Sequence, residues 1–183
     1  MRWIWIDNFV AFQRGKSARA VKNLSLAEDY FADHFPGYPV MPGSLMIEGL
    51  AQTGGILVGE ANDFKEKVVL AKINKAKFHC EALAGQRLLF DVELLIMRLE
   101  GASIKGRVYA QDMTSRPKNS DRAAIDPSDT LVVEAEIFFA HLDQNRSQQF
   151  FGDANFVFDG NLKKLLGLAK VMADQSDNTE TQG

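Results

Sequence analysis

The sequence contains a single cysteine, Cys80, which excludes an internal disulfide. Its three histidines, His34, His79 and His141, lie far apart or directly beside that cysteine. None has the ligand spacing of a structural zinc site, so we expect no metal. No apolar run approaches the roughly 18 residues of a membrane span, and the first residues lack the apolar stretch of a signal peptide. These absences predict a cytoplasmic protein without membrane insertion.

The chain also lacks an excess of positive charge. Its formal net charge is −3, which argues against nucleic acid as a partner because phosphate binding requires a basic face. The apolar fraction of 46% and the charged fraction of 25% are ordinary for a globular protein. A chain of 183 residues is long enough for one domain with its own core.

The residue patterns predict one domain over residues 1–142 and an extension over 143–183. Aromatic and branched residues at 3–12, the turn residue Gly15 and a partly alternating stretch at 17–24 predict an N-terminal hairpin. Apolar residues at helical spacing predict a short helix over 161–172, before a polar disordered tail. The remaining expected elements are a helical turn at 26–32, strands at 68–78, 87–98, 102–110 and 131–140, and an inserted polar loop at 111–129.

A helix without a polar face is predicted over residues 44–60. Pro36, Pro39 and Pro42 exclude a helix from the segment before it, which we expect to be a rigid extended loop. Ser44 is the expected cap of the helix. A helix that is apolar all round must be buried on most sides. An α+β fold, with a sheet wrapped around this helix and a second copy helping to cover it, satisfies that requirement.

Two ionisable side chains interrupt these apolar surroundings. His34 begins the proline-rich loop, and Glu48 lies one turn into the helix. A carboxyl group in apolar surroundings retains its proton more readily than one in water, while an imidazole exchanges a proton near neutral pH. Such a pair suits an elimination, and the helix N-terminus at Gly43 offers N–H groups to a developing enolate oxygen. Two plainer interpretations stay open: His34 is structural, or Glu48 and Gln52 form a solvated stripe.

The stretch HFPGYPVMPG at 34–43, followed by EGLAQ at 48–52, resembles the β-hydroxyacyl-(acyl carrier protein) dehydratases of fatty acid synthesis. Weaker similarity extends over about residues 5–140. The resemblance implies a hot-dog fold, in which an antiparallel sheet wraps a long central helix. It also implies a homodimer with two active sites that each combine residues of both subunits; whether the dimers assemble further into a trimer of dimers is left open. No cofactor is implied.

The resemblance assigns roles to five residues. His34 corresponds to the catalytic base, and Glu48 to the acid that handles the departing water. Gly43 corresponds to the N–H donor to the thioester carbonyl, the Val40 carbonyl to the group that holds the His34 ring, and Gln52 to the partner of Glu48. The expected substrate is a (3R)-hydroxyacyl thioester on an acyl carrier protein. A glutamate at position 48 corresponds to the branch that dehydrates without isomerising the double bond.

Some features depart from the family pattern or leave alternatives open. Asn8 stands where an arginine is common, and the extension over 143–183 has no recognised counterpart. Lys72, Lys75, Lys77 and Arg98 either meet an acidic carrier protein or form a solvated strand face. A hot-dog acyl thioesterase and a non-catalytic acyl-binding subunit are the alternative functions. The presence of both His34 and Glu48 favours the dehydratase, because a binding protein has no need of a buried acid.

Overall fold

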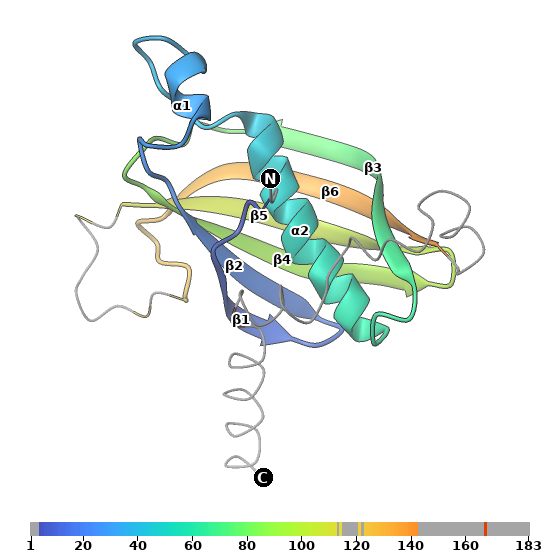
Figure 1. Ribbon diagram of the computed structural model, residues 1–183. Helices are drawn as coiled ribbons and strands as arrows, with labels where there is room; N and C mark the ends of the chain where they lie inside the picture. Colours follow the sequence, from blue (N-terminus) through green and yellow to red (C-terminus); the bar gives the residue numbers. More distant parts are fainter. Residues whose placement is uncertain (1–3, 113, 115–120, 122, 143–166, 168–183) are drawn as a thin grey trace.

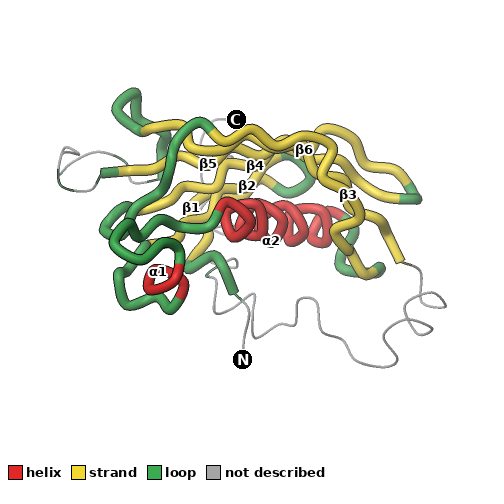
Figure 2. The backbone as a smooth tube through the Cα atoms, turned by 90° about the horizontal axis from the view of Figure 1, so that it is seen from above, coloured by secondary structure: helices red, strands yellow, loops and turns green. Residues whose placement is uncertain are grey.

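The computed structural model describes residues 4–112, 114, 121, 123–142 and 167, and its described part is one curved sheet packed against one long helix (Figure 1). The longer helix, α2 (Gly43–Ala61), crosses one face of the sheet, as the view from above shows (Figure 2). The short helix α1 (Tyr30–Asp33) precedes it. The strands are β1 (Asn8–Gln13), β2 (Ser17–Asn23), β3 (Lys67–Phe78), β4 (Arg87–Arg98), β5 (Gly101–Gln111) and β6 (Thr130–Leu142).

The six strands of the described part of the chain form a single antiparallel sheet in the order β1-β2-β4-β5-β6-β3. Strands β1 and β3 are therefore its two edges. The hairpin between β1 and β2 turns at Gly15, whose φ of 66° suits a residue without a side chain. Strand β3 follows α2 in sequence but pairs with the last strand, β6, so the chain after the helix is carried to the far edge of the sheet.

Helix α2 begins where the proline block ends. Pro42 is its N-cap residue and makes no side-chain cap hydrogen bond. The prediction that Ser44 caps the helix is wrong, because the helix already begins at Gly43 and Ser44 lies inside its first turn. Pro42 suits the position because it sets its own backbone angle and carries no N–H group that would need a partner. Twelve of the 19 helix residues are buried, as the absence of a polar face predicts.

The face of the sheet opposite the helix carries a row of alternating charges. Each residue of the row pairs with the next one across neighbouring strands. The row runs in the order Arg19 on β2, Asp91 on β4, Arg107 on β5, Glu134 on β6 and Lys77 on β3. The Arg19 Nε to Asp91 Oδ1 distance is 2.7 Å, and Arg107 lies 3.7 Å from Asp91. If one strand shifted by one residue along its neighbour, these opposite charges would no longer face each other, so the row favours the observed register. Lys77 in this row supports the solvated-face interpretation of the β3 lysines.

The α+β arrangement predicted from the sequence is confirmed, and most elements begin within one residue of their expected positions. Strand β1 is an exception, because it begins at Asn8 and residues 4–7 before it are not a strand. The predicted helical turn at 26–32 forms later, as α1. The helix predicted over 161–172 lies outside the described residues except for Gly167. No helix among the described residues is long and apolar enough to cross a membrane.

Candidate active site

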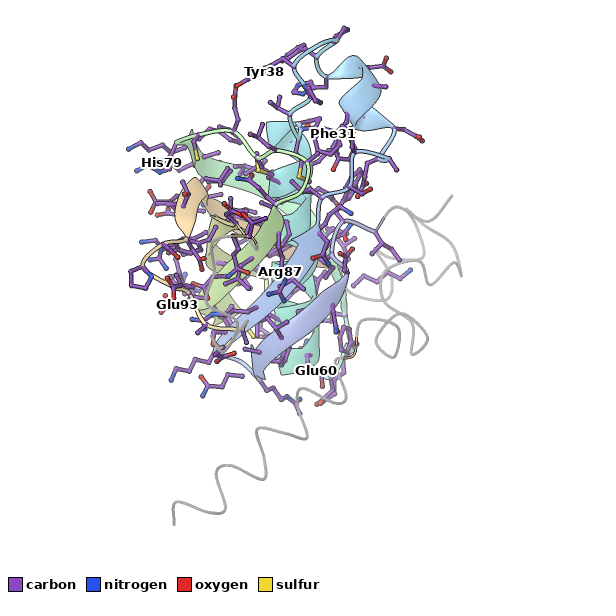
Figure 3. The ribbon with its side chains drawn as sticks, turned by 90° about the vertical axis from the view of Figure 1, so that its left-hand side faces the viewer. Phe31, Tyr38, Glu60, His79, Arg87 and Glu93 are labelled. Carbon is purple, nitrogen blue, oxygen red and sulfur yellow. The ribbon has the colours of Figure 1, made fainter. Side chains whose placement is uncertain are left out.

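The predicted site residues lie around the loop that joins α1 to α2. This loop and the start of α2 occupy one end of the molecule: Figure 3 shows Phe31 and Tyr38 at that end and Glu60 at the opposite end of α2. Strand β3 ends near the same place, because Phe78 packs against Gly43. The end of the molecule at the N-terminus of α2 is therefore where a site built from these residues would form.

The His34 ring is held by a backbone carbonyl. His34 follows α1 directly, and its N–H group donates to the Tyr30 carbonyl at 3.0 Å. Its Nδ1 lies 3.0 Å from the Val40 carbonyl oxygen. Because a carbonyl only accepts hydrogen bonds, Nδ1 carries the proton in this contact. In the neutral ring, Nε2 is then the unprotonated nitrogen and can accept a proton from a substrate.

The loop that carries His34 is fastened to the connection between β3 and β4. The Met41 N–H donates to the Ala82 carbonyl at 2.9 Å, and Val40 forms an isolated bridge with Leu83. The Tyr38 hydroxyl donates to Glu81 Oε2 at 2.5 Å, and this contact raises the pKa of Tyr38. These contacts, together with the prolines, restrict the backbone that positions the His34 ring.

The Glu48 side chain is held by its neighbour one turn along α2. Gln52 Nε2 donates to Glu48 Oε1 at 2.9 Å. The other end of the Gln52 amide is also used, since Oε1 accepts from the Trp5 backbone N–H at 2.9 Å. Glu48 and Gln52 are partly exposed in the single chain, so the burial expected for the carboxyl group is only partial within one copy.

Gly43 is the first residue of α2, at the end of the helix where backbone N–H groups lack helical partners and the dipole is positive. The Phe78 ring covers it closely: a Cβ at position 43 would lie 2.7 Å from Phe78 Cε1. Only a glycine therefore fits here without moving the ring. Phe78 is itself 51% exposed, although it is large and apolar.

In the structure, His34 contacts the Val40 carbonyl and Glu48 accepts a hydrogen bond from Gln52, but these two pairs are not joined to each other. Within the described part of one chain, no hydrogen bond or ion pair links His34 to Glu48. The Trp5 N–H contact was not anticipated from the sequence, and no signal could have found it, because almost every residue carries a backbone N–H. Among the described residues, no three histidine, cysteine or carboxylate side chains are grouped to hold a metal ion.

The two remaining histidines have their partners outside the loop that joins α1 to α2. His79 Nε2 lies 3.1 Å from Glu134 Oε2 on the outer face, and this contact lowers the pKa of Glu134. His141 is buried near the end of β6, where its Nδ1 lies 3.4 Å from Glu66 Oε2. Each histidine therefore has a carboxylate partner away from the His34 and Glu48 side chains, although the buried Nε2 of His141 has no hydrogen-bond partner among the described residues.

Residues 4–115 match the family described as the FabA-like domain. The chain belongs to this family. Among curated FabA-like relatives, "3-hydroxyacyl-[acyl-carrier-protein] dehydratase FabZ" of Koribacter versatilis is 38% identical over 109 residues, which cover 58% of this chain and 70% of that protein. The protein of the same name from Listeria welshimeri is 36% identical over 142 residues, which cover 77% of this chain and 87% of that protein. The resemblance inferred from the loop and helix motif is thus confirmed.

Solved structures support the fold of this FabA-like chain. A chain of the dehydratase heterocomplex ApeI:P from Xenorhabdus doucetiae matches with a TM-score of 0.59 at 12% identity, covering 82% of this chain and 91% of that one. A hypothetical thioesterase from Streptococcus pneumoniae TIGR4, solved with coenzyme A, matches with a TM-score of 0.55 at 9% identity, covering 75% and 86%. At these identities the likeness concerns the fold alone, and it confirms the predicted hot-dog fold.

Proposed function

We propose that this protein dehydrates (3R)-hydroxyacyl thioesters carried on acyl carrier protein to trans-2-enoyl thioesters, in fatty acid or lipid biosynthesis. The observation that carries the proposal is the pair of held side chains, the His34 ring on the Val40 carbonyl and the Glu48 carboxyl group on Gln52. The relatives at 36–38% identity, which are named as dehydratases acting on acyl-carrier-protein substrates, support the same reaction.

In the proposed mechanism, His34 Nε2 removes the proton from C2 of the substrate. The electron pair of that C–H bond forms the C2=C3 double bond, and the C3–O bond breaks. Glu48 gives its proton to the departing hydroxyl, which leaves as water. The Gly43 N–H donates to the thioester oxygen while negative charge develops there. His34 and Glu48 then return to their starting states by exchanging a proton with solvent.

The proposed site combines two copies of the chain. Edge strand β3 is the support for this assembly, because it is exposed along most of its length and bears large apolar side chains. Leu70, Ile73 and Phe78 are 42%, 44% and 51% exposed, respectively. An open strand edge with an apolar surface is a template for pairing with another strand. A homodimer formed along β3 would cover these residues and bring His34 of one protomer toward Glu48 of its partner.

The activity is tested by the reverse reaction, hydration of a crotonyl thioester, followed by the ultraviolet absorbance of the conjugated double bond. We expect His34→Ala and Glu48→Ala each to lower kcat by at least about a hundredfold, the typical contribution of a positioned acid or base. His79→Ala and Glu60→Ala are matched controls that should retain activity, because neither residue belongs to the proposed site. Full activity in either site variant would remove that residue from the mechanism. Release of free thiol without hydration would favour a thioesterase, and tight binding without turnover would favour an acyl-binding subunit.

The shared site is tested by mixing the two inactive variants. A mixed dimer of His34→Ala and Glu48→Ala subunits contains one site with both groups intact. Statistical exchange should therefore restore about a quarter of the wild-type activity, because half of the dimers are mixed and one of the two sites in each is complete. If both groups of a site came from one subunit, every subunit in the mixture would be defective and no activity would return.

A further inference from the structure

Lys22 is a buried cation on the helix-facing side of β2 to which the proposed mechanism assigns no task. Its side chain is only 8% exposed, and of the lysines and arginines whose burial the structure describes, it alone is classed as buried. A buried ammonium group is costly unless it is paired. Here Nζ lies 2.8 Å from Glu28 Oε1 and 3.8 Å from Asp7 Oδ1. The two carboxylates come from different segments, one before α1 and one before β1.

The same ammonium group holds the segment that precedes β1. Nζ lies 5.8 Å from the centroid of the Trp5 ring, within the range of a cation–π contact. Lys22 therefore touches this segment at both Trp5 and Asp7. The Tyr30 ring packs against Trp5 from another side, with the ring centroids 5.7 Å apart. The Asp7 N–H donates to the Val21 carbonyl at 2.7 Å, beside Lys22 on the strand.

The Trp5 backbone, held in this way, is hydrogen-bonded to Gln52, the residue that in turn holds Glu48. The Trp5 N–H donates to Gln52 Oε1, which leaves Gln52 Nε2 to donate to Glu48 Oε1. A side-chain amide has one accepting end and one donating end. The N–H donor at position 5 thus decides that the donating end of Gln52 faces the carboxyl group. If the Trp5 backbone moved, Gln52 Oε1 would lose this donor, and the amide could turn to present its oxygen to Glu48.

We propose that Lys22 is a positioning residue for Glu48 that acts through the Trp5 backbone and the Gln52 amide. This proposal rests on the proposed role of Glu48 in dehydration. It assigns Lys22 no contact with the substrate. Instead, the cation fixes Trp5, which is 47 residues from Gln52 in sequence, and so holds in place the backbone N–H that donates to Gln52 Oε1.

The main test replaces Lys22 by methionine, an unbranched side chain that is one atom shorter and carries no charge. We expect kcat for crotonyl-thioester hydration to fall about tenfold or more, with KM within about twofold, since a misplaced catalytic group impairs the chemical step more than binding. Lys22→Arg keeps the charge and should recover most of kcat. Arg19→Met is the matched control: it removes an ion pair from the same strand on the opposite face, and kcat should change less than about twofold.

A double-mutant cycle separates positioning from a general structural effect. In a Gln52→Ala background the link to Glu48 is already broken, so Lys22→Met should lower kcat less than about twofold further. An equal loss in both backgrounds would overturn the proposal. If Lys22→Met fails to fold, Lys22→Met combined with Glu28→Gln removes the cation together with its nearest carboxylate, and the same cycle applies.

A spectroscopic readout distinguishes this proposal from the proposed function. The side-chain NH₂ resonances of Gln52 can be identified by their loss in Gln52→Ala. Lys22→Met should shift them, and Arg19→Met should not. Unshifted resonances would refute the Lys22 connection even in an active enzyme. Wild-type protein without hydratase activity would instead refute the proposed function, while a shift would still support the link from Lys22 to Gln52.

Discussion

Substituting Gly49 by alanine tests whether α2 and the sheet are in contact as closely as the structure requires. Gly49 follows Glu48 and faces the Phe90 ring of β4, and a Cβ at this position would lie 2.5 Å from Phe90 Cε1 and Cζ. Carbon atoms in contact normally lie about 3.5–4.0 Å apart. The ring must therefore move by about 1 Å, although it is fully buried and its neighbours are closely packed.

The magnitude follows from two opposing effects. Forcing an extra methyl group into a packed core costs about 2–3 kcal/mol, in the upper part of the usual range for overpacking. Alanine in place of glycine inside a helix stabilises by about 1 kcal/mol. We therefore expect Gly49→Ala to lower the free energy of unfolding by about 1–2 kcal/mol. Urea denaturation at a fixed protein concentration measures this change, which should appear as a lower midpoint with an unchanged slope.

Phe90→Leu supplies the matched rescue. A smaller side chain at position 90 leaves room for the new methyl group, so Gly49→Ala should cost clearly less in that background than in the wild type. The reasoning would be refuted if Gly49→Ala stabilised the protein, as it would at an open helix position. It would also be refuted if the cost were equal in the two backgrounds, because the Phe90 ring would then not be the obstacle.

Three further predictions concern single side chains. Tyr30→Phe should leave the free energy of unfolding unchanged or raise it by up to about 1 kcal/mol, because the buried Tyr30 hydroxyl has no hydrogen-bond partner among the described residues; a clear loss in urea denaturation would contradict this. His79 lowers the pKa of Glu134 in the folded state, so the stability from this contact is present above the ordinary glutamate pKa and is lost as the pH falls through the lowered value. Glu134→Gln should therefore destabilise the protein at about pH 6 but not at a pH below the lowered pKa of Glu134, and an equal effect at both would exclude the contact as its cause. Burial, and then Glu81, raise the pKa of the Cys80 thiol, so iodoacetamide should alkylate Cys80 more slowly than free cysteine at neutral pH, and Glu81→Gln should speed the reaction; an unchanged rate in the variant would refute the influence of Glu81.

The sequence predicts the long elements of this fold well because each has a clear physical signal. The prolines before residue 43 stop a helix from beginning earlier, and the apolar residues after it allow no polar face, so α2 forms close to its expected position. Strand β4 has the bounds that its residue pattern predicts, Arg87–Arg98. The aromatic start of the chain misled the prediction of β1. Trp5 favours a strand by type, but it packs against Tyr30 and contacts Gln52 in place of a strand partner.

The contacts around the proposed catalytic groups fall into two classes, those between residues close in the sequence and those between distant segments. Those that join near neighbours, six residues apart for His34 and Val40 and four apart for Glu48 and Gln52, belong to the short motif and can be anticipated from it. The contact of Phe78 with Gly43 and that of Trp5 with Gln52 join distant segments. Neither leaves a trace in local patterning, because an exposed aromatic residue on a strand and a backbone N–H group are both unremarkable in isolation.

The two proposed catalytic side chains, His34 and Glu48, are therefore held in place by different kinds of contact. The orientation of the His34 ring depends on a loop that prolines and local hydrogen bonds restrict, so distant changes should affect it little. The orientation of Glu48 depends on an amide that could present either end, and the choice is made by a segment held through Lys22. A single hydrogen bond of this kind contributes only about 1 kcal/mol to stability, yet it selects which atom faces the carboxyl group. Loss of the hydrogen bond from Trp5 to Gln52 should therefore change kcat more than it changes the free energy of unfolding, whereas substitutions at Gly49 should do the reverse.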